Sequence, residues 1–135
     1  MILGLGARAG IPAAGLAGAL SAVLAEAGIG AAAVTAVATL DRRAAEPGVR
    51  AFAAARGWRL IGFTAGELAR VPVPNPSAAV RDAIGAPGVA EAAALLAAGP
   101  GARLVLPKTR SGPVTVALVV AYPEMGVDNG VEVDC

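Results

Sequence analysis

The sequence has no histidine and a single cysteine, Cys135, which is its last residue. Without histidine the chain has no imidazole to activate a serine or cysteine nucleophile, and no imidazole to bind a metal ion. One cysteine makes neither an intramolecular disulfide nor a zinc site. We therefore expect no metal site, no cofactor and a reducing, cytoplasmic location.

Aromatic side chains and clustered charges are also scarce. The chain has four aromatic residues, and its 11 basic residues stand against 10 acidic ones for a formal net charge of +1. Nucleic-acid-binding surfaces need a dense basic patch, and those that bind single strands add aromatic platforms for base stacking. The composition therefore argues against nucleic acid as a partner.

Strongly apolar runs are missing as well, although residues 9–40 contain only one charge, Glu26. This stretch is mostly alanine and glycine, and it is interrupted at Pro12 and again at residues 28–30. A membrane-spanning helix needs about 20 consecutive, predominantly apolar residues. We expect no membrane segment, and we interpret the alanine as helix-forming residues of a globular protein.

The chain does contain a regular alternation of strand-like and helix-like segments. We predict strands at residues 2–5, 34–40, 59–63, 103–106 and 114–122, and helices at residues 11–27, 47–55, 65–70, 77–84 and 89–98. Such alternation predicts an α/β fold, here a single three-layer α/β/α domain with a mixed, mostly parallel sheet. We expect this domain to occupy residues 1–122 and to be followed by a flexible tail at residues 123–135.

Several helix ends carry recognisable signals. Pro12 and Pro47 suit the first turn of a helix, and Gly28 and Gly57 suit the position just after the last turn. The sequence Thr64-x-x-Glu67 is typical of a capping box.

The most specific sequence lies at residues 71–77, Val-Pro-Val-Pro-Asn-Pro-Ser. Three prolines at every second position exclude helix and central strand, so we predict a rigid, nearly extended connector. This segment resembles the VPNPS signature of the CobE family. The Val-Ala-Glu-Ala-Ala sequence at residues 89–93 is a second motif that resembles the same family. That family also forms the C-terminal domain of CbiG-type cobalt-precorrin-5A hydrolases of cobalamin biosynthesis, and the resemblance extends over residues 4–117.

The first candidate site is the sequence Gly4-x-Gly6-x-x-x-Gly10, which we place between a strand and a helix. Backbone N–H groups at such a turn can bind a phosphate or carboxylate, with Arg8 beside them. A simple tight turn and a nucleotide site are the alternatives, although the spacing is not that of the dinucleotide fingerprint. The loop is similar to the family's Gly-x-Gly-Cys-Arg-Arg-Gly, but it retains only one of the two arginines.

The second candidate site follows the second predicted strand. Asp41, Arg43 and Glu46 resemble the family pattern Thr-Ile-Asp-x-Lys-x-x-Glu-x-Gly, with arginine in place of lysine. A solvated charged loop is the alternative interpretation. Asp41 or Glu46 could also act in acid–base chemistry, because burial can raise the pKa of a carboxyl toward neutral pH.

The third candidate is Lys108, which we place just past a strand and ahead of a Val-Thr-Val-Ala sequence that is similar to the family's. Asn75, Ser77 and Glu91 are further polar candidates. A backbone tie for Asn75, a helix cap for Ser77, and a helix-surface or capping position for Glu91 explain them more simply.

The resemblance implies a cobalamin-biosynthesis protein that binds or hands over a corrinoid or precorrin intermediate without catalysis by itself. Its partners would be that intermediate and other enzymes of the pathway, and the alanine-rich helices make a homodimer plausible. The alternatives are a lactone-opening hydrolase of the cobalt-precorrin-5A type, alone or as one half of a split enzyme, and a nucleotide-binding protein. The candidate ligand-binding residues are Gly4, Gly6, Arg8, Asp41, Arg43, Glu46, Asn75 and Lys108, and no catalytic residue is assigned.

Overall fold

The computed structural model describes residues 1–71 and 88–121. Its strands are β1 (Ile2–Ala7), β2 (Ala36–Leu40), β3 (Arg59–Phe63), β4 (Arg103–Ser111) and β5 (Val114–Val120). Its helices are α1 (Ala13–Ala27), α2 (Asp41–Ala44), α3 (Pro47–Arg56), α4 (Ala65–Ala69) and α6 (Gly88–Ala98), with a 3₁₀ turn at Ala31–Ala33.

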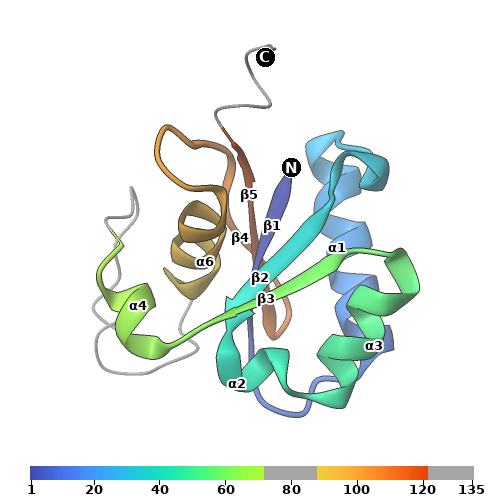
Figure 1. Cartoon of the computed structure of the whole chain (residues 1–135). Coiled ribbons are helices and arrows are strands. Elements are labelled where there is room, and N and C mark those ends of the chain that lie inside the picture. Colours follow the sequence, from blue (N-terminus) through green and yellow to red (C-terminus); the bar gives the residue numbers. More distant parts are fainter. Residues whose placement is uncertain (72–87, 122–135) are drawn as a thin grey trace.

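The strands form one mixed sheet in the order β3-β2-β1-β5-β4. β1, β2 and β3 are parallel, and β5 is antiparallel to both β1 and β4. Four of the five strands therefore run in one direction. Helices α1 and α3 cover one face of the sheet, and α6 and α4 cover the other (Figure 1). The predicted three-layer α/β fold is confirmed.

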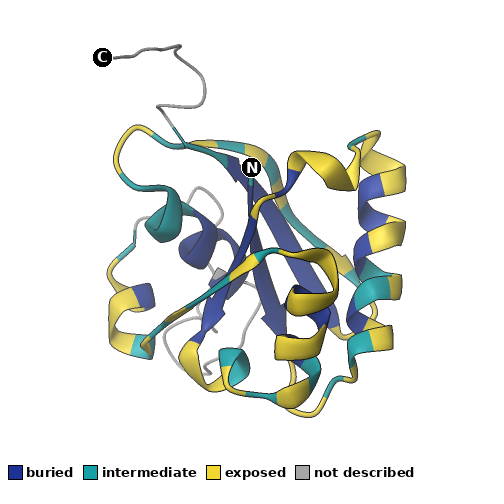
Figure 2. Ribbon diagram, turned by 45° about the vertical axis from the view of Figure 1, so that its right-hand side comes forward, coloured by how far each residue is buried: buried dark blue, intermediate teal, exposed yellow. Residues whose placement is uncertain are grey.

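The two faces of the sheet, which we name after α1 and α6, follow from the alternation of side chains along each strand. Odd-numbered residues of β1 and even-numbered residues of β5 pack on the α1 face with leucine, valine and phenylalanine side chains from α1 and α3. On the α6 face, Ile2 of β1 and the alanines and Leu40 of β2 meet the valine and alanines of α6. Figure 2 shows the central strands buried between the two helical layers.

Helix α6 lies unusually close to β1 because Gly4 has no side chain. A Cβ atom at Gly4 would overlap the carbonyl oxygen of Ala90 and would lie 2.9 Å from the Cβ of Ala94. Apart from Glu91, α6 consists of glycine, alanine, valine and leucine. A helix that is apolar all round is expected to be largely buried, which fits its position against the sheet.

The predicted capping signals are confirmed except at Pro12, which is the N-cap of α1 and precedes its first turn. Gly28 and Gly57 follow α1 and α3 in the left-handed conformation, each with a φ of 71°. Pro47 begins α3, and Thr64 and Glu67 exchange both hydrogen bonds of a capping box at the start of α4. These ends could be predicted because each depends on the local backbone alone.

Several predicted element boundaries were wrong. β2 and α1 each begin two residues later than predicted, at Ala36 and Ala13, and β5 ends two residues earlier, at Val120. β1 continues past residue 5 to Ala7, because its pairing with β5 continues as far as Ala7 opposite Val114. β4 likewise continues past residue 106 to Ser111, since it pairs with β5 as far as the turn. Residues 41–44, predicted as a loop, form the short helix α2, with Asp41 in its first turn and basic residues in its last, as the helix dipole favours.

The predicted helix at residues 77–84 and the predicted tail at residues 123–135 lie outside the described residues. Within the described part of the chain, no helix is long and apolar enough to cross a membrane.

Candidate functional site

The candidate site lies at the carboxyl edge of the sheet, where β1, β2, β3 and β4 all end. The pairing of β1 with β2 stops at Gly4 and Ala38, whereas β2 stays paired with β3 as far as Leu40 and Phe63. β1 therefore separates from β2 near this edge while it remains paired with β5. In open α/β sheets, ligands bind outside the carboxyl ends of the strands.

Two side chains bridge the gap that opens at this edge. One connects β2 to β1, and the other connects α2 to the last residue of β1. The Thr39 hydroxyl donates a hydrogen bond of 2.7 Å to the Leu5 carbonyl, and Thr39 is fully buried. The Arg43 Nε donates to the Ala7 carbonyl at 3.0 Å. Through these bonds, the Leu5 and Ala7 carbonyls at the end of β1 accept hydrogen bonds from side chains instead of from a neighbouring strand. From the sequence, Thr39 is only the first residue of the family pattern around Asp41, because its bridging role depends on the separation of two strands.

Glu46 connects the same elements from the other direction. One of its carboxylate oxygens accepts the backbone N–H of Gly10 at 3.0 Å, and the other lies 2.8 Å from Arg43 Nη1. Arg43 and Glu46 therefore hold the loop after β1 against α2. Their ligand-binding roles stay predictions, but Nε and Nη1 of Arg43 are already engaged by the protein. A small pocket of about 300 Å³ lies beside this loop, lined by Gly10–Pro12 and Glu46–Gly48.

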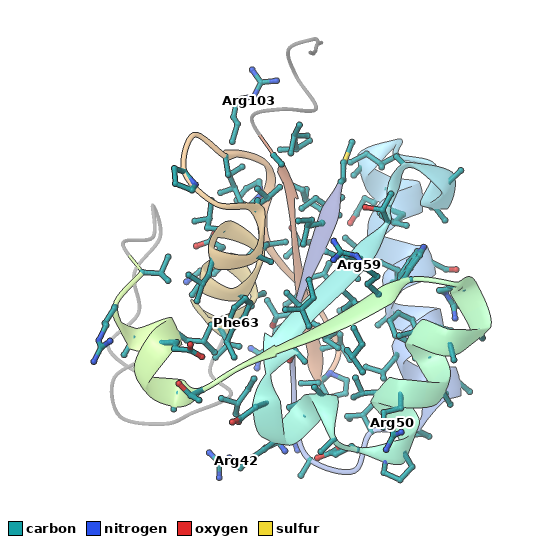
Figure 3. The ribbon with its side chains drawn as sticks, viewed as in Figure 1. Arg42, Arg50, Arg59, Phe63 and Arg103 are labelled. Atoms are coloured by element: carbon teal, nitrogen blue, oxygen red, sulfur yellow. The ribbon has the colours of Figure 1, made fainter. Side chains whose placement is uncertain are left out.

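Arg8 is the cation that this loop presents to solvent. It is exposed and makes no ion pair with any residue in the described ranges. Asp41 is also exposed, and its backbone packs over Gly62 of β3. Arg42 points away from the fold at the same end of the sheet (Figure 3).

Gly4 and Gly6 do not lie where the sequence analysis placed them. Both are inside β1, on its α6 face, and Gly10 is the glycine of the loop, with a φ of 82°. The structure accounts for Gly4 by the close approach of α6 rather than by a turn around an anion. A ligand role for Gly4 and Gly6 stays a prediction. It was based on a loop between strand and helix, whereas both glycines lie inside β1.

Lys108 lies inside β4 rather than beyond its end, at an irregularity between Leu106 and Thr109. Its backbone N–H donates to the Glu91 Oε2 at 2.9 Å. Glu91 is fully buried, so the interpretation of Glu91 as a helix-surface residue was wrong. The sequence signal that could have revealed this is the lack of any other polar residue in α6. The candidate Asn75 lies outside the described residues.

Two further features bear on the chemistry of the site. The described residues contain no group of three or more histidine, cysteine, aspartate or glutamate side chains placed to hold a metal ion. A larger, mostly apolar pocket of about 500 Å³ lies between α4 and the C-terminal half of α6, with Phe63, Leu95 and Leu96 in its lining and Arg70 and Glu67 at its polar part.

Comparison with known proteins identifies the family. Residues 1–119 match the family described as the cobalamin synthesis G C-terminus. The chain belongs to this family. It is therefore a cobalamin-biosynthesis protein of the CobE and CbiG C-terminal type, as the VPNPS segment and the helix after it predicted.

Two curated relatives have different lengths. The chain is 31% identical over 120 residues to the cobalt-precorrin-5A hydrolase of Priestia megaterium, covering 89% of this chain and 32% of the relative. It is 36% identical over 122 residues to the protein CobE of a Sinorhizobium species, covering 87% of this chain and 78% of the relative. The chain thus spans about a third of the hydrolase and most of CobE.

Solved structures of the family share the fold. The crystal structure of CobE, a protein from the cobalamin pathway, superposes with a TM-score of 0.72 at 32% identity, over 87% of each chain. The cobalamin biosynthesis protein ChiG of Agrobacterium tumefaciens superposes with a TM-score of 0.69 at 32% identity, over 90% of this chain and 98% of that one.

Proposed function

We propose that this protein binds an anionic corrinoid or precorrin intermediate at the carboxyl edge of its sheet and hands it to other enzymes of the pathway, without catalysis by itself. The observation that supports this most is the arrangement at that edge. The Arg43–Glu46 pair fixes the loop after β1, and the loop presents Arg8 to solvent. Lys108 lies on the same sheet, two strands away from β1.

The chemistry of the ligand class fits these cations. Corrinoid intermediates carry acetate and propionate side chains around a flat ring, and guanidinium and ammonium groups bind carboxylates through charge-assisted hydrogen bonds. Arg8 and Lys108 would each take one peripheral carboxylate. Arg43 and Glu46 would act mainly by holding the loop that carries Arg8.

The test is a spectroscopic titration of the whole chain with hydrogenobyrinic acid near physiological salt, repeated with Arg8→Gln and Lys108→Gln. We expect saturable binding that each substitution weakens by about tenfold, the effect of losing one charge-assisted contact. Arg59→Gln is the matched control, because Arg59 is an exposed arginine at the opposite, amino edge of the sheet. If the unaltered protein binds no corrin at tens of micromolar, the proposal is wrong.

A lactone-opening hydrolase is the second candidate function, and the 31% identity to the hydrolase of Priestia megaterium favours it. Because the match covers 32% of that enzyme, the chain would act as one part of a split hydrolase. The test is to mix the chain with a separately produced partner and a cobalt-precorrin-5A substrate. Absence of both acetaldehyde release and lactone opening would count against this function.

Location and assembly are part of the same proposal. We infer a cytoplasmic location because a chain with one cysteine has no disulfide framework for an oxidising compartment. A homodimer stays a prediction, which the mass of the protein in solution would test.

A further inference from the structure

β4 is an edge strand with a bulge whose position decides where its cations point. Leu106 pairs with Leu118, but three residues later Thr109 pairs with Val116, so β4 contains one residue more than β5 between these pairs. Pro107 and Lys108 are left opposite Ala117. Pro107 has no N–H to give to the ladder, and the N–H of Lys108 goes to the Glu91 side chain instead of a strand partner.

The bulge reverses the face on which the following cation lies. Residues directly opposite each other in an antiparallel pair point to the same face. Arg110 pairs with Thr115, which pairs in turn with Gly6, and Gly6 belongs to the α6 face of β1. Arg110 therefore lies on the α6 face, in one row with Thr115 and Gly6.

Without the bulge, the register set at Leu106 would continue by one-to-one steps. Arg110 would then lie opposite Val114, and Lys108 opposite Val116. Both valines belong to the apolar cluster of the α1 face. A slip of one residue would thus move Arg110 from the α6 face to the α1 face of the sheet.

Glu91 is the side chain that holds the bulge. It is fully buried in the first turns of α6, and its Oε2 lies 2.9 Å from the Lys108 nitrogen. A buried carboxylate has a high desolvation cost, which hydrogen bonds from the protein must offset. Helix α6 is itself fixed against β1 by the contact at Gly4, so Glu91 ties β4 to a rigid part of the fold.

We propose that Arg110 is a further ligand-binding residue of this site, taking a carboxylate of the ligand, and that Glu91 is a positioning residue that places Arg110 by fixing the bulge at Lys108. This inference rests on the proposed function. Arg110 is exposed and makes no ion pair with another described residue. It lies at the carboxyl edge, two strand spacings or about 10 Å from β1, within the span of a ligand that also reaches the Arg8 loop.

The first test compares two arginines of the same strand. Arg103 begins β4 at the amino edge, and Figure 3 shows it at the opposite end of the sheet from Arg42. In titrations with hydrogenobyrinic acid, Arg110→Gln should weaken binding about 10- to 100-fold, the usual effect of losing a charged hydrogen bond. Arg103→Gln should change it by less than about twofold, since it alters only distant, screened charge. Equal effects of the two substitutions would overturn the role of Arg110.

A second ligand separates direct contact from a structural effect. When the carboxyl groups of hydrogenobyrinic acid are converted to amides, the loss caused by Arg110→Gln should shrink to within about twofold of the unaltered protein, because the charge that Arg110 meets is gone. A loss of the same size with both ligands would mean that Arg110 acts on the fold, and the proposal would fail.

The role of Glu91 is measured first without ligand. Glu91→Leu should speed hydrogen exchange at the Lys108 amide, and Glu91→Gln, which keeps an acceptor oxygen, should restore protection. In titrations, Glu91→Leu should weaken binding as much as Arg110→Gln does, and the double substitution should be no weaker than Arg110→Gln alone. If Glu91→Leu does not fold, Glu91→Asp, with its carboxylate drawn back by one methylene, takes its place.

The outcomes separate the two proposals. Binding by the unaltered protein that Arg110→Gln leaves unchanged would overturn this inference and leave the proposed function standing. Unchanged exchange at Lys108 in Glu91→Leu would overturn the positioning role alone. No binding by the unaltered protein would overturn the proposed function, and the ligand role of Arg110 with it.

Discussion

The two faces of the sheet are packed with side chains of different size. The α1 face is filled by large apolar side chains, and Phe52, Leu3 and Leu5 are among the largest fully buried ones. The α6 face combines larger side chains such as Ile2 and Leu40 with many alanines, and a glycine of β1 meets the backbone of α6 directly. Of the buried polar residues in the described ranges, Glu91 and Thr115 lie on or against the α6 face, and Thr39 lies on β2 at the carboxyl edge.

This difference gives the two faces different structural roles within one layer of strands. Large side chains bury more apolar area, so the α1 face supplies more of the hydrophobic stabilisation. The α6 face uses close backbone approach to hold a buried carboxylate against the bulge of β4. Substitutions on the two faces should therefore destabilise the protein in different ways.

Phe52→Ala should have the largest effect, because it empties the centre of the α1 face. Phe52 is 1% exposed, and its ring packs edge-on against Trp58 with the ring centroids 5.8 Å apart. The guanidinium carbon of Arg56 lies 4.5 Å from the centroid of the Phe52 ring. We expect the free energy of unfolding to fall by about 3–5 kcal/mol, measured by urea denaturation. Phe52→Leu should lose clearly less, and an equal loss would show that cavity size does not govern this face.

Gly4→Ala should destabilise the α6 face by overpacking rather than by a cavity. The added methyl group would overlap the Ala90 carbonyl, and we expect a loss of about 2–3 kcal/mol in the same assay. Gly18→Ala is the matched control. Gly18 is exposed within α1 with open space around it, so alanine there should stabilise by about 1 kcal/mol. A neutral Gly4→Ala would contradict the close packing of α6 on β1.

Thr39→Val tests the hydrogen bond at the point where β1 separates from β2. Valine keeps the shape but removes the donor to Leu5, leaving a buried carbonyl without its 2.7 Å hydrogen bond. We expect a loss of about 1–2 kcal/mol in thermal or urea unfolding. Thr35→Val should cost less than about 0.5 kcal/mol, because the Thr35 hydroxyl bond is exposed and 3.3 Å long. Equal costs would mean that Thr39 does not bridge the two strands.

Glu46→Ala should have the smallest effect on stability and a local effect on the loop after β1. The Arg43–Glu46 pair is partly exposed, so its loss should cost less than about 1 kcal/mol. Hydrogen exchange at the Gly10 amide should nevertheless become faster, since Glu46 accepts that N–H and alanine has no acceptor. Glu26→Ala, at an exposed glutamate of α1, should leave Gly10 exchange unchanged. Unaltered exchange in Glu46→Ala would remove the support for a fixed Arg8 loop.

Much of the fold could be predicted because its signals are local. The caps at Gly28, Gly57 and Thr64 follow from single-turn geometry, and β3 was predicted at the residues where it lies. The ends of β1 and β4 could not be predicted in this way. Both strands extend because β5 pairs with them, and that pairing joins segments that are distant in the sequence or separated by a turn.

The candidate site divides in the same way. The sequence pointed to Arg8, Arg43, Glu46 and Lys108 through family patterns, and the structure joins Arg43 and Glu46 through the loop after β1. The sequence did not point to Arg110, because the face of the sheet on which Arg110 lies depends on the bulge in β4. It also gave Glu91 the wrong environment, since one polar residue in a helix of alanines is normally assumed to face solvent.

The family, the α/β class and most of the helix ends follow from the amino-acid sequence, because composition, spacing and caps act over a few residues. The face that each cation occupies, and the charged side chains that the protein engages in its own contacts, follow from tertiary structure. Those properties depend on strand register, and a shift of one residue in register exchanges the two faces of a strand.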